Sequence, residues 1–330
     1  MNNYKTINKL NQSLLKEILK SPQAFLRAKE RYQSDEGVIA PHFVFGSLVD
    51  HLITEDHNTF EDIFYLTSES SCSDTIIKVV THCFEENPTG KLEDHYESIV
   101  RGCGYEVYGQ SWKEETRVKK VIEQGSEYFN MLIESAGKTI VFGEEYNKAL
   151  ISHASLLSDP YTSKYLKPNN NQQLIKKQIV EFTYKSIELK GELDLVFIDH
   201  NNKTITPIDV KTIGTSVYQF PFNFWKFRYD FQAAVYTYGI ECTMNKLINQ
   251  GYVIDNFKFL VVEKESQNTP LIYSIDNDVL EIGMNGGSLP SGRSYEGFEQ
   301  AINKYLFHIE KNDWSYPMEY YKQGEITIDL

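Results

Sequence analysis

Two aspartates stand inside apolar runs of residues 191–211, which read GELDLVFIDHNNKTITPIDVK. Asp194 lies within LDLVFI, Asp209 lies within PIDVK, and Lys211 follows Asp209 by two residues. A carboxylate in an apolar run is rarely left without a partner, because burying an unpaired charge costs free energy. These three side chains are therefore the first candidates for chemistry.

A hairpin would bring the two aspartates together. Residues 201–202 are both asparagine, which tolerates positive φ, and they predict a two-residue turn. In that register Asp194 faces Asp209, and Glu192 faces Lys211. Like charges directly opposite each other repel, since cross-strand Cβ atoms are only roughly 4.5–5.5 Å apart. The other face of both strands is also apolar, so we expect a hairpin covered on both sides, with its acidic end in a cleft or at its mouth.

A divalent cation would remove this repulsion. Two neighbouring carboxylates can hold one Mg²⁺ or Mn²⁺, because these hard ions prefer oxygen ligands. A lysine on the same face can orient an attacking water or stabilise charge that develops on a phosphoryl group. The arrangement is suited to phosphodiester hydrolysis. The alternative is a solvated strand end with a salt bridge between Glu192 and Lys211, and the D-x-K spacing alone does not decide between the two.

Periodicity and turn signals predict the elements that carry these residues. Helical patterns fill the first half of the chain, with Ser13 as the expected cap of the first helix and Pro22 at the start of the second. The order of elements predicts an α/β or α+β core with a helical N-terminal half. We divide the chain into residues 1–140 and 141–330, with one continuous domain as the alternative. Helices are expected at 13–20, 22–32, 41–56, 112–135, 143–160, 227–248 and 295–314, and strand-forming runs at 177–198, 203–213, 256–265 and 270–276.

The pattern G-x-x-D followed after a spacer by D-x-K resembles the core motif of the PD-(D/E)xK nuclease superfamily. Further stretches resemble its RecB-type and phage RecE-like exonuclease branch, and the matches span most of residues 12–318. They are LLKEILKSPQAF, FGSLVDHLI, QAAVY, FKFLVVEKESQNTPLIYSID and KNDWSYP. The resemblance implies a restriction-endonuclease-like core, with a central mixed β-sheet flanked by helices. It also implies a metal-dependent exonuclease that hydrolyses phosphodiester bonds at linear DNA ends.

The same resemblance implies the roles of individual residues. The family places a metal-binding histidine four residues after a glycine. Here Asp50 stands four residues after Gly46 and His51 comes next, so either can be the ligand, with Asp50 favoured. Neighbouring helical side chains point about 100° apart, and His51 has the alternative of a partly buried helix histidine. The catalytic candidates are Asp194, Asp209, Lys211, Gln232 and Tyr236, and the metal candidates are Asp50, His51, Asp194, Asp209 and the carbonyl of Val210.

Gln232 and Tyr236 lie four apart and so share one helical face, where the resemblance places them beside the scissile phosphate or the base. The alternative is a tyrosine in the core and a glutamine at a helix end. Residues 220–231, FPFNFWKFRYDF, interleave aromatic rings with Lys226 and Arg228. Rings and cations in this pattern are typical of stacking on bases and contacting phosphates, although at least half of these rings are expected in the core.

Composition bounds the partners. The chain has 330 residues, 24% of them charged, and a formal net charge of −13, which argues against a surface coated in positive charge for DNA. A ring-shaped homo-oligomer, which the resemblance suggests, would enclose linear duplex DNA despite this charge. The resemblance also implies phage-type recombination or replication as the setting, with a single-strand annealing protein as the expected partner. The alternatives are an endonuclease, a flap or single-strand nuclease, and a catalytically decayed DNA-binding protein.

Mg²⁺ or Mn²⁺ is the expected cofactor. The cysteines are far apart, a serine precedes Pro22, and no cysteine follows Cys242, so we expect no iron–sulfur cluster. No Gly-rich Walker-type loop is present, which predicts no nucleotide site. No stretch approaches the ~20 apolar residues that cross a membrane, and the N-terminus has no apolar signal segment. We therefore expect no membrane partner and a cytoplasmic protein.

Overall fold

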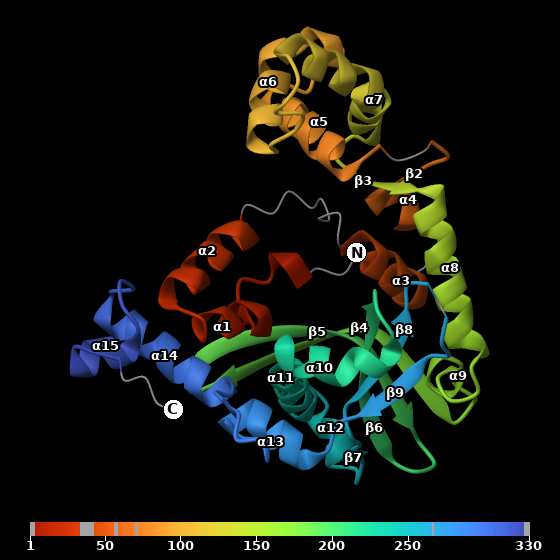
Figure 1. The fold of residues 1–330 in the computed structure, drawn as a ribbon. Coiled ribbons are helices and arrows are strands. Elements are labelled where there is room, and N and C mark those ends of the chain that lie inside the picture. The colour runs from red at the N-terminus through yellow and green to blue at the C-terminus, as the bar shows by residue number, and fades with distance from the viewer. Residues whose placement is uncertain (1–3, 34–42, 56–58, 70–71, 266, 327–330) are drawn as a thin grey trace. The chain divides into compact units, whose positions relative to one another are not determined.

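The computed structural model describes residues 4–33, 43–55, 59–69, 72–265 and 267–326 (Figure 1). Contacts within the chain divide it into two compact units. Unit 1 comprises residues 1–35, 52–55 and 151–330, and unit 2 comprises residues 36–51 and 56–150. The division at residue 140 that we expected stays a prediction.

A mixed seven-stranded sheet forms the centre of unit 1, which confirms the predicted α/β class. The order is β1-β5-β6-β8-β9, with β4 also paired to β5 and β7 to β6. β5 runs antiparallel to β4 and β6, whereas β6 and β8 are parallel (Figure 1). The strands are β1 (Leu10–Asn11), β4 (Gln172–Tyr184), β5 (Ile187–Asp199), β6 (Thr204–Ile213), β7 (Val253–Ile254), β8 (Lys258–Glu263) and β9 (Leu271–Ser274).

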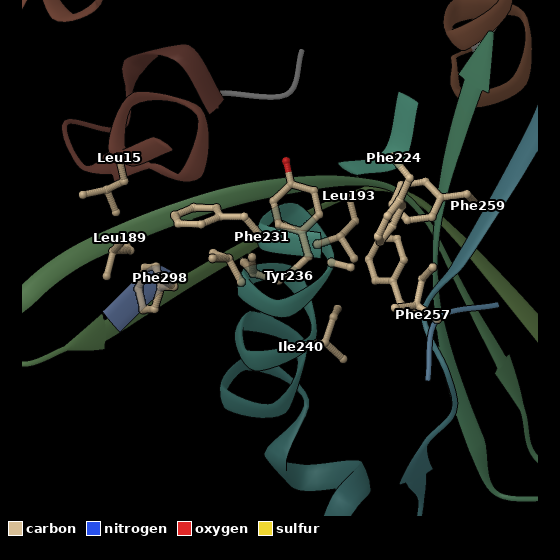
Figure 2. Packing of buried hydrophobic residues seen from close by; sticks show 14 of the residues in the cluster. Leu15, Leu189, Leu193, Phe224, Phe231, Tyr236, Ile240, Phe257, Phe259 and Phe298 are labelled. Atoms are coloured by element: carbon tan, nitrogen blue, oxygen red, sulfur yellow. The ribbon is translucent and has the colours of Figure 1, made fainter. Parts of the chain in front are cut away.

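Helices pack against this sheet. Helix α11 carries buried residues on all sides, as expected for a helix in the interior of a unit. Figure 2 shows Phe231, Tyr236 and Ile240 of this helix among rings and aliphatic side chains from the strands and from α1 and α14. The helices of unit 1 are α1 (Gln12–Ile18), α2 (Pro22–Gln33), α9 (Ser163–Leu166), α10 (Phe220–Lys226), α11 (Tyr229–Thr243), α12 (Asn245–Ile248), α13 (Asn277–Asn285), α14 (Phe298–Lys311) and α15 (Met318–Gln323).

Unit 2 has a separate helical core. Val79 and Val80 of α5, Ile99 of α6, and Val121 and Phe129 of α7 are all fully buried there. Strands β2 and β3 form a short parallel pair. Its elements are α4 (Phe60–Ile63), β2 (Phe64–Thr67), α5 (Asp74–Glu86), α6 (Tyr96–Tyr105), α7 (Glu114–Ser135) and β3 (Thr139–Phe142), while α3 (Val44–Thr54) and α8 (Gly143–Ser158) each run across the boundary between the units.

Two local predictions were wrong. The cap of α1 is Asn11, whose side chain accepts a hydrogen bond from the Leu14 amide at 2.9 Å, and Ser13 lies inside the helix. Asn11 ends β1 and already has the extended backbone that an N-cap needs. The hairpin loop has four residues, 200–203, with positive φ at Lys203.

The hairpin register agrees with the prediction where the ladder exists. Leu195 pairs with Ile208 and Asp199 pairs with Thr204. The Asp199 carboxylate closes the loop, because it accepts hydrogen bonds from the backbone amides of residues 201 and 202. The ladder ends at Leu195. The expected direct pairings of Asp194 with Asp209 and of Glu192 with Lys211 are therefore not part of this ladder, and the Lys211 ammonium lies beside Asp209 instead. Among the described residues, no helix is long and apolar enough to span a bilayer.

Candidate active site

A gap along one edge of β5 positions the candidate site. β4 pairs with one edge of β5 from residue 187 to residue 199. The opposite edge pairs with β1 at residues 189–190 and with β6 at residues 195–199. Residues 191–194 thus lie between two partner strands, at the point where β6 diverges from β5. Asp194 is the last residue of this gap.

At this divergence Asp194 is joined to β6 by a hydrogen bond from the residue that follows Asp209. The Val210 amide donates to Oδ2 of Asp194 at 2.9 Å. Gln232 Nε2 donates to Oδ1 of Asp209 at 2.6 Å, and Lys211 Nζ lies 2.6 Å from Oδ2 of the same carboxylate. Two strands and helix α11 therefore bring four of the five predicted catalytic residues into one connected cluster.

Burial and neighbouring charges shift the pKa values of this cluster. Asp209 is only 3% exposed, and burial raises its pKa to about 6, with the charge of Asp194 adding to the rise and the charge of Lys211 opposing it. Burial acts to lower the pKa of Lys211, but Asp209, Tyr229 and Asp194 together outweigh burial and the net shift is upward. Lys211 is consequently an ammonium at neutral pH and donates hydrogen bonds.

Tyr236, the fifth predicted residue, enters the same region from α11. Its ring packs on Gly191, where an added Cβ would lie 2.9 Å from Cε1 of the tyrosine and 3.0 Å from Cγ2 of Val180. Figure 2 shows the tyrosine hydroxyl at the edge of the packed carbon atoms, pointing out of the cluster. Burial raises the pKa of Tyr236 well above its ordinary value, and the charges of Asp209 and Asp194 act in the same direction. The side chain is a phenol that can donate a hydrogen bond.

Sequence reasoning missed Lys177, which lies opposite Asp194 on β4. Its φ of +50° is left-handed, and the ladder between β4 and β5 omits this one pair. Nζ of Lys177 lies 3.7 Å from Oδ1 of Asp194 and 4.0 Å from Oε1 of Glu192. A non-glycine residue in this conformation costs roughly 1–2 kcal/mol, and such strain concentrates at functional sites. No sequence pattern signals it, because lysine is ordinary in an exposed strand.

Lys16 was missed for a different reason. The Tyr229 ring lies 4.9 Å from Nζ of Lys211, and Nζ of Lys16 donates to the carbonyl of Phe227 at 3.0 Å. Burial lowers the pKa of Lys16 to about 8, the carboxylate of Glu17 opposes this, and the charge of Lys211 adds to it. Lys16 reads as an ordinary surface lysine of an amphipathic helix, and only the tertiary fold brings it near the site.

Asp50 and His51 lie on α3, in the part of that helix that belongs to unit 2. His51 is 5% exposed, and its ring meets those of Phe60 and Phe64 edge to face at 5.7 and 5.6 Å. This environment is that of a buried helix histidine. The ligand roles of Asp50 and His51 stay predictions.

The two predicted DNA contacts have different surroundings. Lys226 is exposed at the end of α10, with Nζ 5.2 Å from the Phe227 ring. Arg228 forms a close ion pair with the fully buried Asp230 at 2.9 Å and also donates to the carbonyl of Glu296. Arg228 is therefore already engaged within the fold, whereas Lys226 faces solvent.

The donor set suits a hard divalent cation. Asp194, Asp209 and the carbonyl of Val210 offer oxygen atoms only, and Mg²⁺ is commonly bound through one or two carboxylates with waters completing its shell. In the described part of the chain, no three His, Cys, Asp or Glu side chains gather as a metal site. The ammonium of Lys211 provides the positive charge beside Asp209.

Comparisons with known proteins give a weak structural likeness. No family model matches the sequence, and none of the curated proteins matches it. A crystal structure named "Putative exonuclease", from Eubacterium rectale, aligns over 100% of this chain and 94% of that chain, with 11% sequence identity and a TM-score of 0.42. At this TM-score the likeness does not establish the function, which has to be inferred from the residues of this chain.

Proposed function

We propose that this protein is a metal-dependent deoxyribonuclease that hydrolyses phosphodiester bonds at the ends of linear DNA. The observation that carries the proposal is the connected cluster of Asp194, Asp209, Lys211 and Gln232 at the divergence of β5 and β6. Burying two neighbouring carboxylates and an ammonium costs free energy. Binding of a divalent cation and a polyanionic substrate would explain why the fold places these charges together. The resemblance to PD-(D/E)xK exonucleases adds support through stretches outside this cluster, such as LLKEILKSPQAF and KNDWSYP.

A Mg²⁺ or Mn²⁺ ion held by Asp194, Asp209 and the carbonyl of Val210 would supply an activated water and stabilise the departing 3′ oxygen. Lys211, as an ammonium, orients that water or a phosphate oxygen and does not accept its proton.

Two residues of α11 complete the proposed site. The amide of Gln232 fixes the plane of the Asp209 carboxylate by holding Oδ1. The phenol of Tyr236 can donate to a phosphate oxygen, because its raised pKa keeps the hydroxyl protonated. These are positioning and charge-stabilising roles, which need fixed geometry rather than further titration.

The biological setting that fits is phage-type recombination or replication, with a single-strand annealing protein as partner and a homo-oligomeric ring around the duplex. A ring would enclose the duplex despite the net charge of −13. Sedimentation of the protein as a monomer at micromolar concentration would count against it.

The test is digestion of a linear, 5′-phosphorylated duplex with Mg²⁺, beside covalently closed circular DNA. We expect linear DNA to disappear, circles to survive, and EDTA, Asp209→Asn and Lys211→Met each to abolish the reaction. Lys203→Met is the matched control, because Lys203 lies in the loop of the same hairpin and bonds the Gln250 carbonyl. Cleavage of circles would make the protein an endonuclease of the same fold.

One observation favours a second candidate, a DNA-binding protein with a decayed nuclease fold. Among the described residues no three-ligand group of acidic, histidine or cysteine side chains is present. Wild type and Asp209→Asn that are equally inert on every DNA form with Mg²⁺ and Mn²⁺, yet bind DNA, would establish this candidate and refute the nuclease.

A further inference from the structure

The segment between β6 and α11 carries aromatic rings on two opposite sides. Residues 217–219 form a 3₁₀ turn that continues directly into α10. Phe220 and Phe224 point inward and are 2% and 5% exposed, whereas Tyr218 and Phe222 are 65% and 67% exposed. The inward rings account for the packing of this helix. The outward rings add nothing to the core.

The outward side chains form one row. Tyr218 and Phe222 are four residues apart, as are Phe222 and the exposed Lys226, so all three share a helical face. Phe227, which is 44% exposed, follows at the end of the row with Lys226 Nζ 5.2 Å from its ring. We call Tyr218, Phe222, Lys226 and Phe227 the outer stripe.

The outer stripe is continuous with the candidate active site. The ring of Phe227 lies 5.9 Å from that of Tyr229, and Tyr229 in turn lies 4.9 Å from Nζ of Lys211. The carbonyl of Phe227 also accepts a hydrogen bond from Nζ of Lys16. Cations thus lie at the end of the stripe that adjoins the catalytic cluster, although the chain as a whole is acidic.

Exposed rings interleaved with cations suit a single nucleic-acid strand. Unpaired bases stack on aromatic rings while lysines contact the phosphates, and each stacked base is worth roughly 1–3 kcal/mol. A paired duplex offers no free base faces to such rings, so its binding would depend on charge alone. We propose that the outer stripe binds the unpaired bases of a single-stranded DNA segment whose backbone runs toward Asp209 and Lys211.

This inference rests on the proposed function and adds a substrate class to it. The substrate is a strand with unpaired nucleotides next to the scissile phosphate, as in a single strand or a frayed end. The stripe holds that strand in place, whereas the cluster of Asp209 and Lys211 acts on its backbone.

Binding without cleavage tests the stripe. The probes are fluorescein-labelled oligo(dT) and a blunt hairpin duplex with the same number of phosphates, titrated in EDTA with the intact protein. We expect Phe222→Ala to weaken oligo(dT) binding at least about fivefold, with a larger loss in Tyr218→Ala/Phe222→Ala. The affinity for the hairpin should change less than about twofold. Tyr161→Ala is the matched control, because Tyr161 is 69% exposed in the same unit and lies outside the stripe.

A pair of variants at one position separates stacking from apolar contact. Phe222→Trp should keep oligo(dT) affinity and show quenched fluorescence on binding, whereas Phe222→Leu should lose affinity as Phe222→Ala does. Both retain an apolar side chain at an exposed position, so folding is not at issue. Equal affinities of Phe222→Leu and Phe222→Trp, or unchanged affinity in the double alanine variant, would overturn the inference.

The two proposals fail in different ways. Mg²⁺-dependent digestion by a wild type whose stripe variants bind oligo(dT) normally would overturn the stripe and leave the nuclease. Selective loss of oligo(dT) binding by stripe variants of a protein that cleaves no DNA would support the stripe and refute the nuclease.

Discussion

Replacing Lys16 with methionine tests how the fold keeps a positive charge beside the candidate site. Lys16 lies on α1 and donates to the carbonyl of Phe227 at 3.0 Å. Burial lowers its pKa to about 8, Glu17 opposes that shift, and the charges of Lys211 and nearby cations add to it. The side chain is nevertheless protonated at pH 7, so the folded state carries a charge that its surroundings disfavour.

The size of this cost follows from the pKa. A fall from 10.5 to about 8 corresponds to about 3 kcal/mol at 1.36 kcal/mol per unit, and partial solvent exposure of the lysine reduces this to about 2 kcal/mol. Methionine keeps most of the apolar stem and loses one hydrogen bond worth about 1 kcal/mol. We therefore expect Lys16→Met to raise the free energy of unfolding by about 1 kcal/mol at pH 7.

The gain should depend on pH with a definite sign. Between about pH 8 and pH 10.5 the unfolded chain binds more protons at Lys16 than the folded chain does, so wild-type stability rises with pH in this window. The methionine variant lacks this term. Its advantage should shrink as the pH rises and reverse near pH 10, while all other titrating groups are common to both proteins.

Urea unfolding at pH 7 and pH 10 measures the effect. Lys20→Met is the control, because Lys20 is exposed near the end of the same helix, pairs only with Glu17 in the described structure, and should change stability by less than about 0.5 kcal/mol. A Lys16→Met protein that is less stable than wild type at pH 7, or a difference that stays constant with pH, would refute the reasoning.

Further predictions concern the gap in β5 and the metal. Gly191→Ala should destabilise the protein by about 1–3 kcal/mol in urea, because its Cβ would lie 2.9 Å from the Tyr236 ring; an unchanged midpoint would rule out close packing as the reason for the glycine. Lys177→Gly should be more stable than Lys177→Ala by about 1 kcal/mol, because only glycine adopts the left-handed φ of +50° without steric strain. Equal stabilities of the two variants would contradict a left-handed backbone at this position. Mn²⁺ at a hundred times its dissociation constant should stabilise wild type by about 2.7 kcal/mol and leave Asp194→Asn/Asp209→Asn unchanged; a similar shift in both would place the metal elsewhere.

The sequence predicted the parts of the site that depend on local pattern. A turn centred on residues 201–202 predicted the hairpin register, and the four-residue spacing of Gln232 and Tyr236 placed both on one face of α11. The Gln232 amide then reaches Asp209 as that helix crosses the sheet. These features follow from strand and helix periods, which neighbouring residues determine.

The features that the sequence could not predict depend on contacts between residues that are far apart in the chain. Lys16 meets the carbonyl of Phe227, more than two hundred residues away, and Lys177 has its left-handed φ at the point where the ladder between β4 and β5 is interrupted. The loop was misjudged because the Asp199 carboxylate, rather than an asparagine backbone, closes it. Tertiary contacts override local turn preference in such cases.

Gly191, the glycine of the G-x-x-D motif, allows close packing against α11, and this packing links it to the proposed catalytic residue Gln232. Gly191 lets Tyr236 lie directly on β5, and the same helix carries Gln232 one turn earlier. A side chain at position 191 would push the helix outward and lengthen the 2.6 Å bond from Gln232 to Asp209. Gly191→Ala and Gln232→Ala should therefore impair cleavage by the same route, and their effects in the double variant should be less than additive. Fully additive losses would show that the glycine acts on the site independently of Gln232.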